Sequence, residues 1–253
     1  SSLAPVMAAA AQRTAQRLEE HGPAPIDVMQ EMVQTTFDVI SEVTFSGDGG
    51  FDSGAVHTAI DAYIAAAGKI SLLDMLGVPD WIPRAGRIKS KRSVANMKEM
   101  ADAAIHDRKL RGGGPEPDLL DLLLSGEDPE TGRRMNTSEL RDNLLTFIVA
   151  GHETTALTLA WSLYLCAFDP KVQEAARVEA QSVLNGKTAD ANDLTRLPIL
   201  RQIVDEALRL YPPAGILSRT ARAADTLCAR NIHPGDTVMI PIYALHRHHA
   251  LWD

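Results

Sequence analysis

A carboxyl group and two hydroxyl groups follow a glycine in the middle of a long apolar segment, in the run Ala150-Gly151-His152-Glu153-Thr154-Thr155. Carboxyl and hydroxyl groups are among those that transfer protons in enzymes. Glu153 and Thr154 conflict with the apolar residues around them, and such conflicts often mark function. A structural alternative is a buried Thr bonded to its own helix, with Glu153 paired to a remote cation.

Helical spacing places the small, acidic and hydroxyl residues of this segment on one face. Along the chain that face is apolar, then small, then acid plus alcohol, then apolar again: Thr146, Val149, Ala150, Glu153, Thr154, Leu157 and Trp161. The glycine weakens the helix here, and a Thr hydroxyl can capture the carbonyl of Ala150 and open a local bulge. We therefore expect a local irregularity in the helix beside the acid and the alcohol.

A second pair with possible chemistry is Glu206 and Arg209, which stand just before Tyr211-Pro212-Pro213. Three residues apart on a helix, they share a face and can form a bidentate ion pair. Surface pairs of this spacing are common and contribute little stability, so the pair alone is weak support for a site. From Arg209 onward the chain has five arginines against three aspartates, which leaves open a solvated surface or a site for an anionic group.

Three segments resemble metal- or phosphate-binding motifs, but each lacks residues that the motif requires. The zinc motif His-Glu-x-x-His begins at His152, but Ala156 stands where the second histidine is needed. His246-Arg247-His248-His249 has three imidazoles without a second cluster of carboxylate or thiolate ligands. The glycine-rich run 112–114 lacks the Gly-Lys-Ser/Thr of a phosphate loop. We expect no metal ligand in this chain.

The elements that must position these residues are mostly helices. We predict helices over residues 4–20, 25–45, 54–75, 88–111, 118–124, 137–168, 170–184 and 198–211. Thr137 is expected to cap the long helix 137–168. Apolar and polar residues alternate at 216–222, 226–228 and 236–240, which predicts short strands in a small sheet. The predicted fold class is mainly α with a small β-sheet region.

Composition excludes several classes of protein. The chain has 253 residues, of which 45% are apolar and 23% charged, so it can build a packed core and is neither disordered nor collagen-like. No apolar run reaches the roughly 18 residues of a membrane-spanning helix. A net charge of −8 argues against a dedicated nucleic-acid binder. Two cysteines are too few for a disulfide scaffold, so we expect a reducing, cytoplasmic location.

The ordered set of motifs resembles the cytochrome P450 family of haem-thiolate monooxygenases. The resemblance is specific over residues 137–253, and the first 130 residues match only as a generic helical series. It is carried by Ala150-Gly151-His152-Glu153-Thr154-Thr155, Glu206-x-x-Arg209, Tyr211-Pro212-Pro213, Ser218-Arg219-Thr220-Ala221, Gly235-Asp236-Thr237-Val238 and His246-Arg247 before Trp252. It implies a cytochrome P450-like fold that is incomplete at both ends.

The resemblance implies that 1–253 is part of a single domain. Its expected regions are 1–136, a helical region; 137–168, the long central helix; 169–211, helices ending in the Glu-x-x-Arg motif; and 212–253, a small strand region with the start of a following helix. The chain would then be an interior piece of a longer enzyme.

The resemblance also implies roles for single residues around a haem. Glu153 and Thr154 would be the acid and alcohol that deliver protons to iron-bound dioxygen, because O–O cleavage needs protons in a dry pocket. Residues implied to contact the cofactor are Ala150 and Gly151, which would leave room for dioxygen, Thr154, the propionate ligand Arg219, and His246 near the same propionate. An apolar substrate would be lined by Thr146, Val149, Ala150, Ile216 and Leu217. Glu206 and Arg209 would form a structural ion pair.

The family also needs a cysteine whose sulfur binds the haem iron, in a Gly- and Phe-rich loop. Cys166 lies near the end of the long helix and Cys228 in a predicted strand, so both are expected to be small packed residues. We expect the cysteine ligand to lie beyond Asp253. This chain alone should then not hold haem through a thiolate and should be inactive.

The implied activity is insertion of one oxygen atom from dioxygen into an apolar organic substrate. Electrons would come from a ferredoxin or a flavoprotein reductase. A haem-thiolate isomerase or peroxygenase of the same fold stays open, although the Glu153–Thr154 pair favours the monooxygenase. A helical interaction module without a cofactor also stays open, and it would need neither motif.

Overall fold

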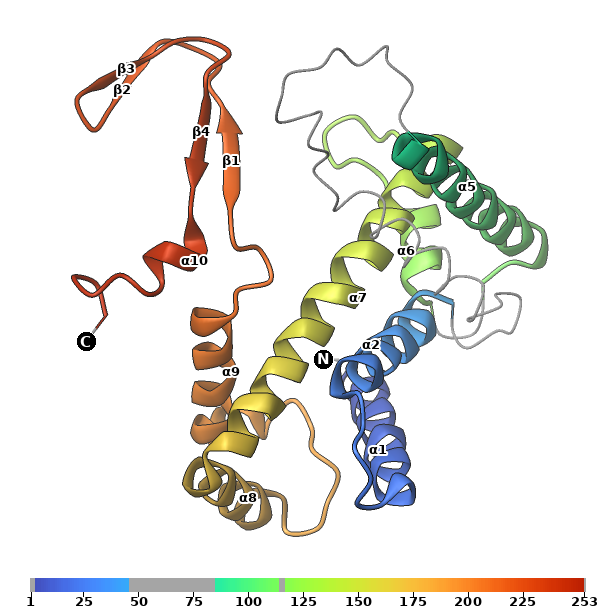
Figure 1. Cartoon of the computed structure of the whole chain (residues 1–253). Helices are drawn as coiled ribbons and strands as arrows, with labels where there is room; N and C mark the ends of the chain where they lie inside the picture. The colour runs from blue at the N-terminus through green and yellow to red at the C-terminus, as the bar shows by residue number, and fades with distance from the viewer. Residues whose placement is uncertain (1–2, 46–84, 114–116, 253) are drawn as a thin grey trace. The chain divides into compact units, whose positions relative to one another are not determined.

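The computed structural model describes residues 3–45, 85–113 and 117–252 (Figure 1). Its contacts form two compact units, the middle unit, Thr35–Glu153, and the terminal unit, Ser1–Gln34 with Thr154–Asp253. The helix predicted over 54–75 lies outside the described residues, as does part of the glycine-rich loop. Among the described helices, none is both long and apolar enough to cross a membrane.

The middle unit is helical. It contains α5 (Ala85–Arg111) and α6 (Leu119–Ser125), together with the adjoining parts of α2 (Val28–Phe45) and α7 (Thr137–Phe168). Its core is formed by buried side chains from all four helices: Phe37, Phe45, Met97, Ala101, Ile105, Leu120, Leu140, Leu144 and Ile148. The burial of this apolar stripe is what holds α7 against α5 and α2.

One cluster of buried and half-buried polar side chains fixes the end of α5 and the start of α6. Asp118 caps α6, since it accepts from the Asp121 amide at 3.0 Å while Asp121 accepts from the Asp118 amide at 3.3 Å. The guanidinium of Arg108, near the end of α5, contacts both carboxylates at 2.8 and 2.9 Å. This ion pair network joins the end of α5 to the start of α6.

The prediction that Thr137 caps α7 is wrong. Thr137 is the first helical residue, and the cap is Asn136, whose Oδ1 accepts from the Glu139 amide at 3.0 Å. Glu139 in turn accepts from the Asn136 amide at 2.9 Å, which completes a capping box. The amide oxygen of Asn136 satisfies a backbone donor of the first turn that Thr137, already inside the helix, does not reach.

The terminal unit contains α1 (Ala4–His21), α8 (Pro170–Leu184) and α9 (Pro198–Leu210). A short 3-10 helix, η1 (Leu194–Arg196), precedes α9. Proline stands at the first turn of α1, α8 and α9, where its missing N–H costs no hydrogen bond. Beyond α9 the chain forms strands and then α10 (Ile242–Leu245).

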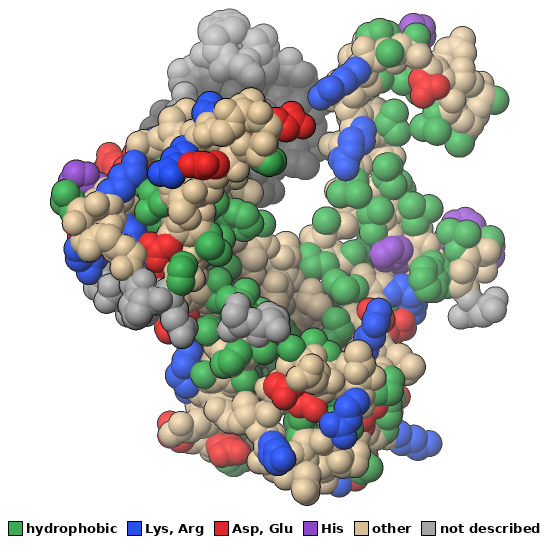
Figure 2. Space-filling model, turned by 180° about the vertical axis from the view of Figure 1, so that it is seen from behind, with side chains coloured by type: hydrophobic (Ala, Val, Ile, Leu, Met, Phe, Trp, Pro, Cys, Tyr) green, Lys and Arg blue, Asp and Glu red, His purple; other side chains and the backbone are tan. Residues whose placement is uncertain are grey.

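The strands form two separate antiparallel ladders rather than one small sheet. β1 (Leu217–Thr220) pairs with β4 (Thr237–Ile240), and β2 (Asp225–Leu227) pairs with β3 (Arg230–Ile232), a strand the sequence pattern did not predict (Figure 1). The register sets Leu217 opposite Ile240. Apolar side chains are exposed along the β1–β4 arm and α10 (Figure 2), namely Ile216, Met239, Ile240, Tyr243 and Leu245.

Candidate functional site

The long helix α7 has a buried stripe and an opposite exposed stripe. Leu144, Ile148, His152 and Ala156 recur every fourth residue and are at most 3% exposed. Thr146, Ala150 and Thr154 recur with the same spacing and are exposed, while Val149 and Glu153 beside them are half-buried. The core therefore grips one side of α7 and leaves the predicted small, acid and alcohol residues on its accessible side.

The helix is continuous through the motif, and the predicted bulge does not form. Residues 137–168 are α-helical throughout, and the Thr158 hydroxyl donates to the carbonyl of Thr154 at 2.9 Å without breaking the helix. Such a bond satisfies the hydroxyl locally and leaves the ladder of backbone bonds in place. Thr146 makes the same kind of bond, to the Asp142 carbonyl at 2.7 Å.

Gly151 has a packing role that the sequence did not reveal. A Cβ at this position would stand 3.0 Å from Cδ1 of Ile40, on α2. Glycine is therefore what lets α2 approach α7 closely, just before the acid and the alcohol. That Gly151 also leaves room for dioxygen stays a prediction.

His152 faces the core, away from the exposed stripe. It is 1% exposed, and its ring meets Phe37 edge-on with centroids 5.8 Å apart and an interplanar angle of 89°. Within the described residues no group of three or more His, Cys, Asp or Glu side chains could hold a metal ion. His152 is thus a packed histidine of the core.

A groove with a cavity volume of about 400 Å³ runs between α5 and α7 in the middle unit. It brings together three of the residues predicted to line the substrate, Thr146, Val149 and Ala150, and places them opposite Val94 and Met97. Aliphatic and thioether side chains on both walls make most of this groove apolar, as in sites for small organic ligands.

Glu206 and Arg209 form the predicted ion pair in the terminal unit. The guanidinium binds the carboxylate in a bidentate manner, with Nε to Oε2 at 2.7 Å and Nη2 to Oε1 at 2.5 Å. The hydrogen bond from Arg209 lowers the pKa of Glu206. The Glu206 side chain is 50% exposed, so the pair is not the fully buried kind.

Arg209 also ties α9 to the segment after α10. Its Nη1 donates to the His246 carbonyl at 2.9 Å, and its guanidinium carbon lies 5.3 Å from the centre of the Trp252 ring. One side chain thereby holds a carboxylate, a carbonyl and an aromatic face, which only the planar fork of an arginine can do at once. The ion pair is therefore a clamp at the end of α9.

An aromatic stack joins the same region to α7. Trp161 lies parallel to Tyr211 with centroids 3.8 Å apart, and the guanidinium of Arg247 covers both Tyr211, at 5.4 Å, and Tyr243, at 3.7 Å. These contacts link α7, the end of α9 and α10 within the terminal unit. No local pattern predicts these contacts, because the partners are far apart along the chain.

The other predicted site residues lie on the β1–β4 arm or just after α10. Ile216 is exposed and precedes β1, Leu217 is half-buried at its start, and Arg219 is exposed, with Nη1 donating to the Ser218 carbonyl at 2.8 Å. His246 directly follows α10, and its Nδ1 is buried without a hydrogen-bond partner among the described residues. The β1–β4 arm and the Glu206–Arg209 clamp belong to the terminal unit. The middle unit contains the predicted site residues of α7 up to position 153, namely Thr146, Val149, Ala150, Gly151 and Glu153.

The two cysteines differ in their surroundings. Cys166 is half-buried in α7, and burial raises the pKa of its thiol. Cys228 is exposed and lies in the β2–β3 turn with φ 51°, so its predicted place, a packed position in a strand, is wrong. With Ala229 at φ 59°, it forms a two-residue hairpin turn that needs left-handed backbone at both positions.

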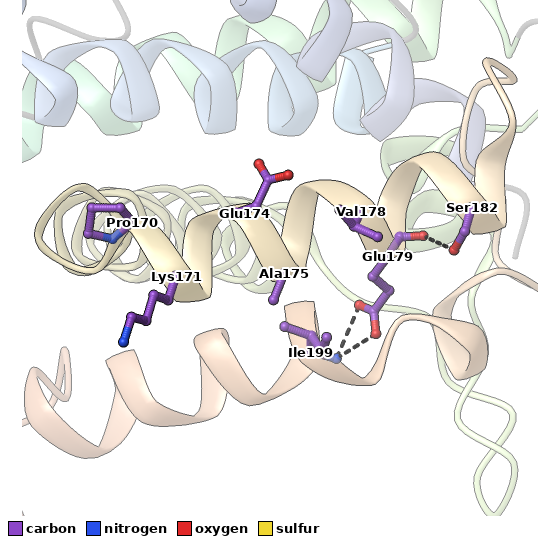
Figure 3. Close-up of a pocket in the computed structure, with 8 residues that line it drawn as sticks. All are labelled: Pro170, Lys171, Glu174, Ala175, Val178, Glu179, Ser182 and Ile199. Atoms are coloured by element: carbon purple, nitrogen blue, oxygen red, sulfur yellow. Dashed lines mark hydrogen bonds between the residues drawn. The ribbon is translucent and has the colours of Figure 1, made fainter.

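A second hollow lies between α8 and α9 (Figure 3), with a volume of about 840 Å³. On its wall, Glu179 accepts from the Ile199 amide at 2.9 and 3.1 Å and from the Leu200 amide at 3.1 Å. The carboxylate thus caps the first turn of α9, which begins at Pro198. Glu179 is a structural residue that the sequence pattern missed, because the cap comes from another helix.

Comparison with known proteins agrees with this geometry. The family model described as "Cytochrome P450" matches residues 1–253. The crystal structure of the cytochrome P450DA heme domain superposes with a TM-score of 0.83 at 30% identity, covering 99% of this chain and 55% of that one. The fold is therefore the mainly helical cytochrome P450 fold with small antiparallel sheets.

Curated relatives point the same way. Cyclooctatin synthase of Streptomyces melanosporofaciens is 32% identical over 90% of this chain and 50% of its own length. Cyclooctat-9-en-7-ol 5-monooxygenase of the same organism is 34% identical over 70% of this chain and 38% of its own length. The chain spans half or less of the length of these two relatives. It belongs to the cytochrome P450 family.

Proposed function

We propose that the protein containing this chain is a haem-dependent monooxygenase that inserts one oxygen atom from dioxygen into an apolar organic substrate. The observation that carries the proposal is the pair of consecutive residues Glu153 and Thr154 on the accessible side of α7, next to Ala150. The kinship with a protein named as a monooxygenase supports it. The apolar α5–α7 groove beside the same face supports an apolar substrate.

Residues of the terminal unit fit a haem, whose propionates are carboxylates. Arg219 is exposed and, within the described part of the chain, forms no ion pair, so its guanidinium can bind a carboxylate. The buried Nδ1 of His246 has no hydrogen-bond partner there, as expected of a nitrogen that awaits one. We propose Arg219 and His246 as propionate contacts, and Ala150, Gly151 and Thr154 as further residues that contact the cofactor.

When bound, the haem supplies the iron at which dioxygen is reduced. The chain's own residues supply protons and exclude water. Glu153, half-buried, takes up a proton at its carboxylate from solvent, and the exposed Thr154 holds one at Oγ1 on the face that carries Ala150. Val149 and Ala150 keep that face apolar, which strengthens the hydrogen bonds made there.

Electrons are proposed to come from a ferredoxin or a flavoprotein reductase. A relative in Bacillus subtilis, 29% identical over 90% of this chain, is named "Bifunctional cytochrome P450/NADPH--P450 reductase 2", so that protein carries its reductase in the same chain.

We propose a cytoplasmic location for the present protein. The thiolate ligand of the iron is proposed to lie beyond Asp253.

The experiment is oxidation by the full-length protein under isotopically labelled dioxygen. Purified protein should show a Soret band, and product formed with a reductase and NADPH should carry one labelled oxygen atom. Product with label only from added peroxide would assign a peroxygenase, and rearranged product without label an isomerase. Absence of the Soret band would favour the interaction module and overturn the proposal.

A further inference from the structure

The end of α8 carries the one asparagine of this chain that is followed by a glycine. Asn185 closes the helix in the left-handed conformation, with φ 47°, and Gly186 continues with φ 77°. The Asn185 amide donates to the Gln181 carbonyl at 2.9 Å. The Lys187 amide donates to the Leu184 carbonyl, also at 2.9 Å. These two bonds satisfy carbonyls of the last turn, as is usual where a helix ends in this conformation.

The Gly186 amide, which stands between these two bonds, is unused. Within the described residues it donates no hydrogen bond, and the side-chain amide of Asn185 makes none either. Both residues are exposed, and the space around Gly186 is open. Because glycine has no Cβ, its nitrogen is also unshielded on that side. A carboxamide followed directly by an accessible backbone nitrogen is the arrangement that forms a cyclic imide.

The other asparagines of the chain lack this combination. Each is followed by a residue with a side chain, namely Met, Thr, Leu, Asp or Ile after Asn96, Asn136, Asn143, Asn192 and Asn231. The side chain of Asn143 also donates to the Glu139 carbonyl at 2.8 Å. The amide that follows Asn192 donates to the Asp190 carbonyl at 3.2 Å. These asparagines are therefore internal references within the same protein.

The reaction at Asn185 requires one rotation of the backbone. At ψ 46° the Gly186 nitrogen lies on the far side of the Asn185 Cα–C bond from the side chain, so this bond must turn before the two groups meet. The rotation breaks the bond from Lys187, which comes later in the chain, and keeps the bond that the Asn185 amide donates. Opening therefore costs about one backbone hydrogen bond, at a helix end where local opening is common.

We propose that Asn185 is a site of spontaneous deamidation. The Gly186 nitrogen loses its proton to hydroxide and attacks Cγ of Asn185. The N–Cγ bond forms, the Cγ–Nδ2 bond breaks, and Nδ2 leaves as ammonia. Water then opens the cyclic imide at either carbonyl, which gives aspartate or isoaspartate. No oxidant, reductant or haem takes part, so the inference does not rest on the proposed function.

The isoaspartate product loosens the end of α8. Its main chain runs through the former side chain and is longer by one carbon, so the Lys187 amide no longer reaches the Leu184 carbonyl. Its free carboxylate lies at the helix C-terminus, where the helix dipole disfavours a negative charge. The next residues are tied to α1 by a hydrogen bond from Gln12 Nε2 to Thr188 Oγ1 at 2.8 Å. This tie between α1 and the segment after α8 weakens as the protein ages.

The test incubates the full-length holoenzyme at mildly alkaline pH in heavy-oxygen water and follows its tryptic peptides by mass spectrometry. We expect the peptide with Asn185 to be converted and to carry heavy oxygen, while the peptides with Asn143 and Asn192 stay unmodified. The rate should be within about 10-fold of that in a synthetic peptide of the same sequence, because one backbone hydrogen bond protects by no more than this. Stronger protection, or equal conversion at Asn192, would overturn the proposal.

Two variants separate the steps. Gly186→Ala should slow the conversion, because the added Cβ shields the nitrogen and meets no other atom within 4 Å. Asn185→Asp is the matched control for charge, since it adds a carboxylate without lengthening the main chain. Hydrogen exchange of the Lys187 amide should be about 10-fold faster in the isoaspartate form, the worth of one backbone hydrogen bond, and close to wild type in Asn185→Asp. Undiminished conversion in Gly186→Ala would overturn the assigned reaction, and unchanged exchange in the isoaspartate form would overturn its effect on α8.

Discussion

Replacing Arg108 by methionine should be among the most destabilising single changes in the middle unit. The Arg108, Asp118 and Asp121 side chains are 10%, 4% and 13% exposed, and the guanidinium lies 2.8 and 2.9 Å from the two carboxylates. Desolvation opposes a charged Arg108, but the hydrogen bonds that it donates to both aspartates, together with their charges, outweigh this and raise its pKa. Methionine keeps the apolar stem and leaves two buried carboxylates without their cation, which costs about 3–5 kcal/mol.

The assay is denaturant unfolding of the full-length protein, followed by a signal of the α5–α6 region such as amide hydrogen exchange. Lys109→Met, one residue further on an exposed position, is the control and should change the free energy of unfolding by less than about 0.5 kcal/mol. Adding Asp118→Asn and Asp121→Asn to Arg108→Met should recover part of the loss, because Asn keeps the caps of α6 without the charge. A loss in Arg108→Met no larger than in the control, or no recovery in the triple variant, would refute the reasoning.

Three further predictions concern other parts of the fold. Arg209 lowers the pKa of Glu206, so the ion pair stabilises the folded state at pH values above 4.5, the ordinary pKa of a glutamate, and this contribution is lost as the pH falls below that value. Glu206→Gln should therefore be less stable than the wild type by a constant amount near neutral pH and by a smaller amount in acid, as measured by urea unfolding. Gly151→Ala should change stability by less than about 1 kcal/mol, because the gain in helix propensity offsets the 3.0 Å approach to Ile40, whereas Gly151→Val should cost about 1–3 kcal/mol; thermal unfolding distinguishes them. Ala229→Gly should stabilise the protein by about 0.5–1 kcal/mol, because it relieves a left-handed backbone at φ 59°, and an unchanged or lower melting temperature would contradict this.

Local sequence signals predict the helices well where a capping residue or a proline marks the end of one helix and the start of the next. The predicted limits of 137–168 and 170–184 agree with α7 and α8, since Asp169 caps the second helix and Pro170 occupies its first position. The sequence also contains a signal for the observed cap of α7, because Asn136 and Glu139 have capping-box spacing. The neighbouring Thr137 is a cap residue type as well, and spacing alone does not favour one over the other. β3 was missed because Arg230 and Asn231 are polar and its pattern is too short to alternate.

Features built from distant segments could not be predicted. Lys98 is a lone lysine on a helix, and its place beside the α5–α7 groove depends on how α5 packs against α7. Gly151 reads as a weak point in a helix until Ile40 is seen against it. The acid and alcohol of α7 were predictable because a conflict with local propensity is visible in sequence, whereas packing partners are not.

The most direct measurement is the coupling of product to reductant in Thr154→Ala, with the full-length protein, its reductase and a substrate that is turned over. If Thr154 delivers protons, the variant should keep its Soret band and consume NADPH at a substantial rate, while product per NADPH falls about 10-fold or more, as for loss of a general acid–base group. Thr158→Ala, one turn further along α7 with its hydroxyl bonded to the Thr154 carbonyl at 2.9 Å, should stay coupled. Unchanged product per NADPH in Thr154→Ala would contradict the proton relay.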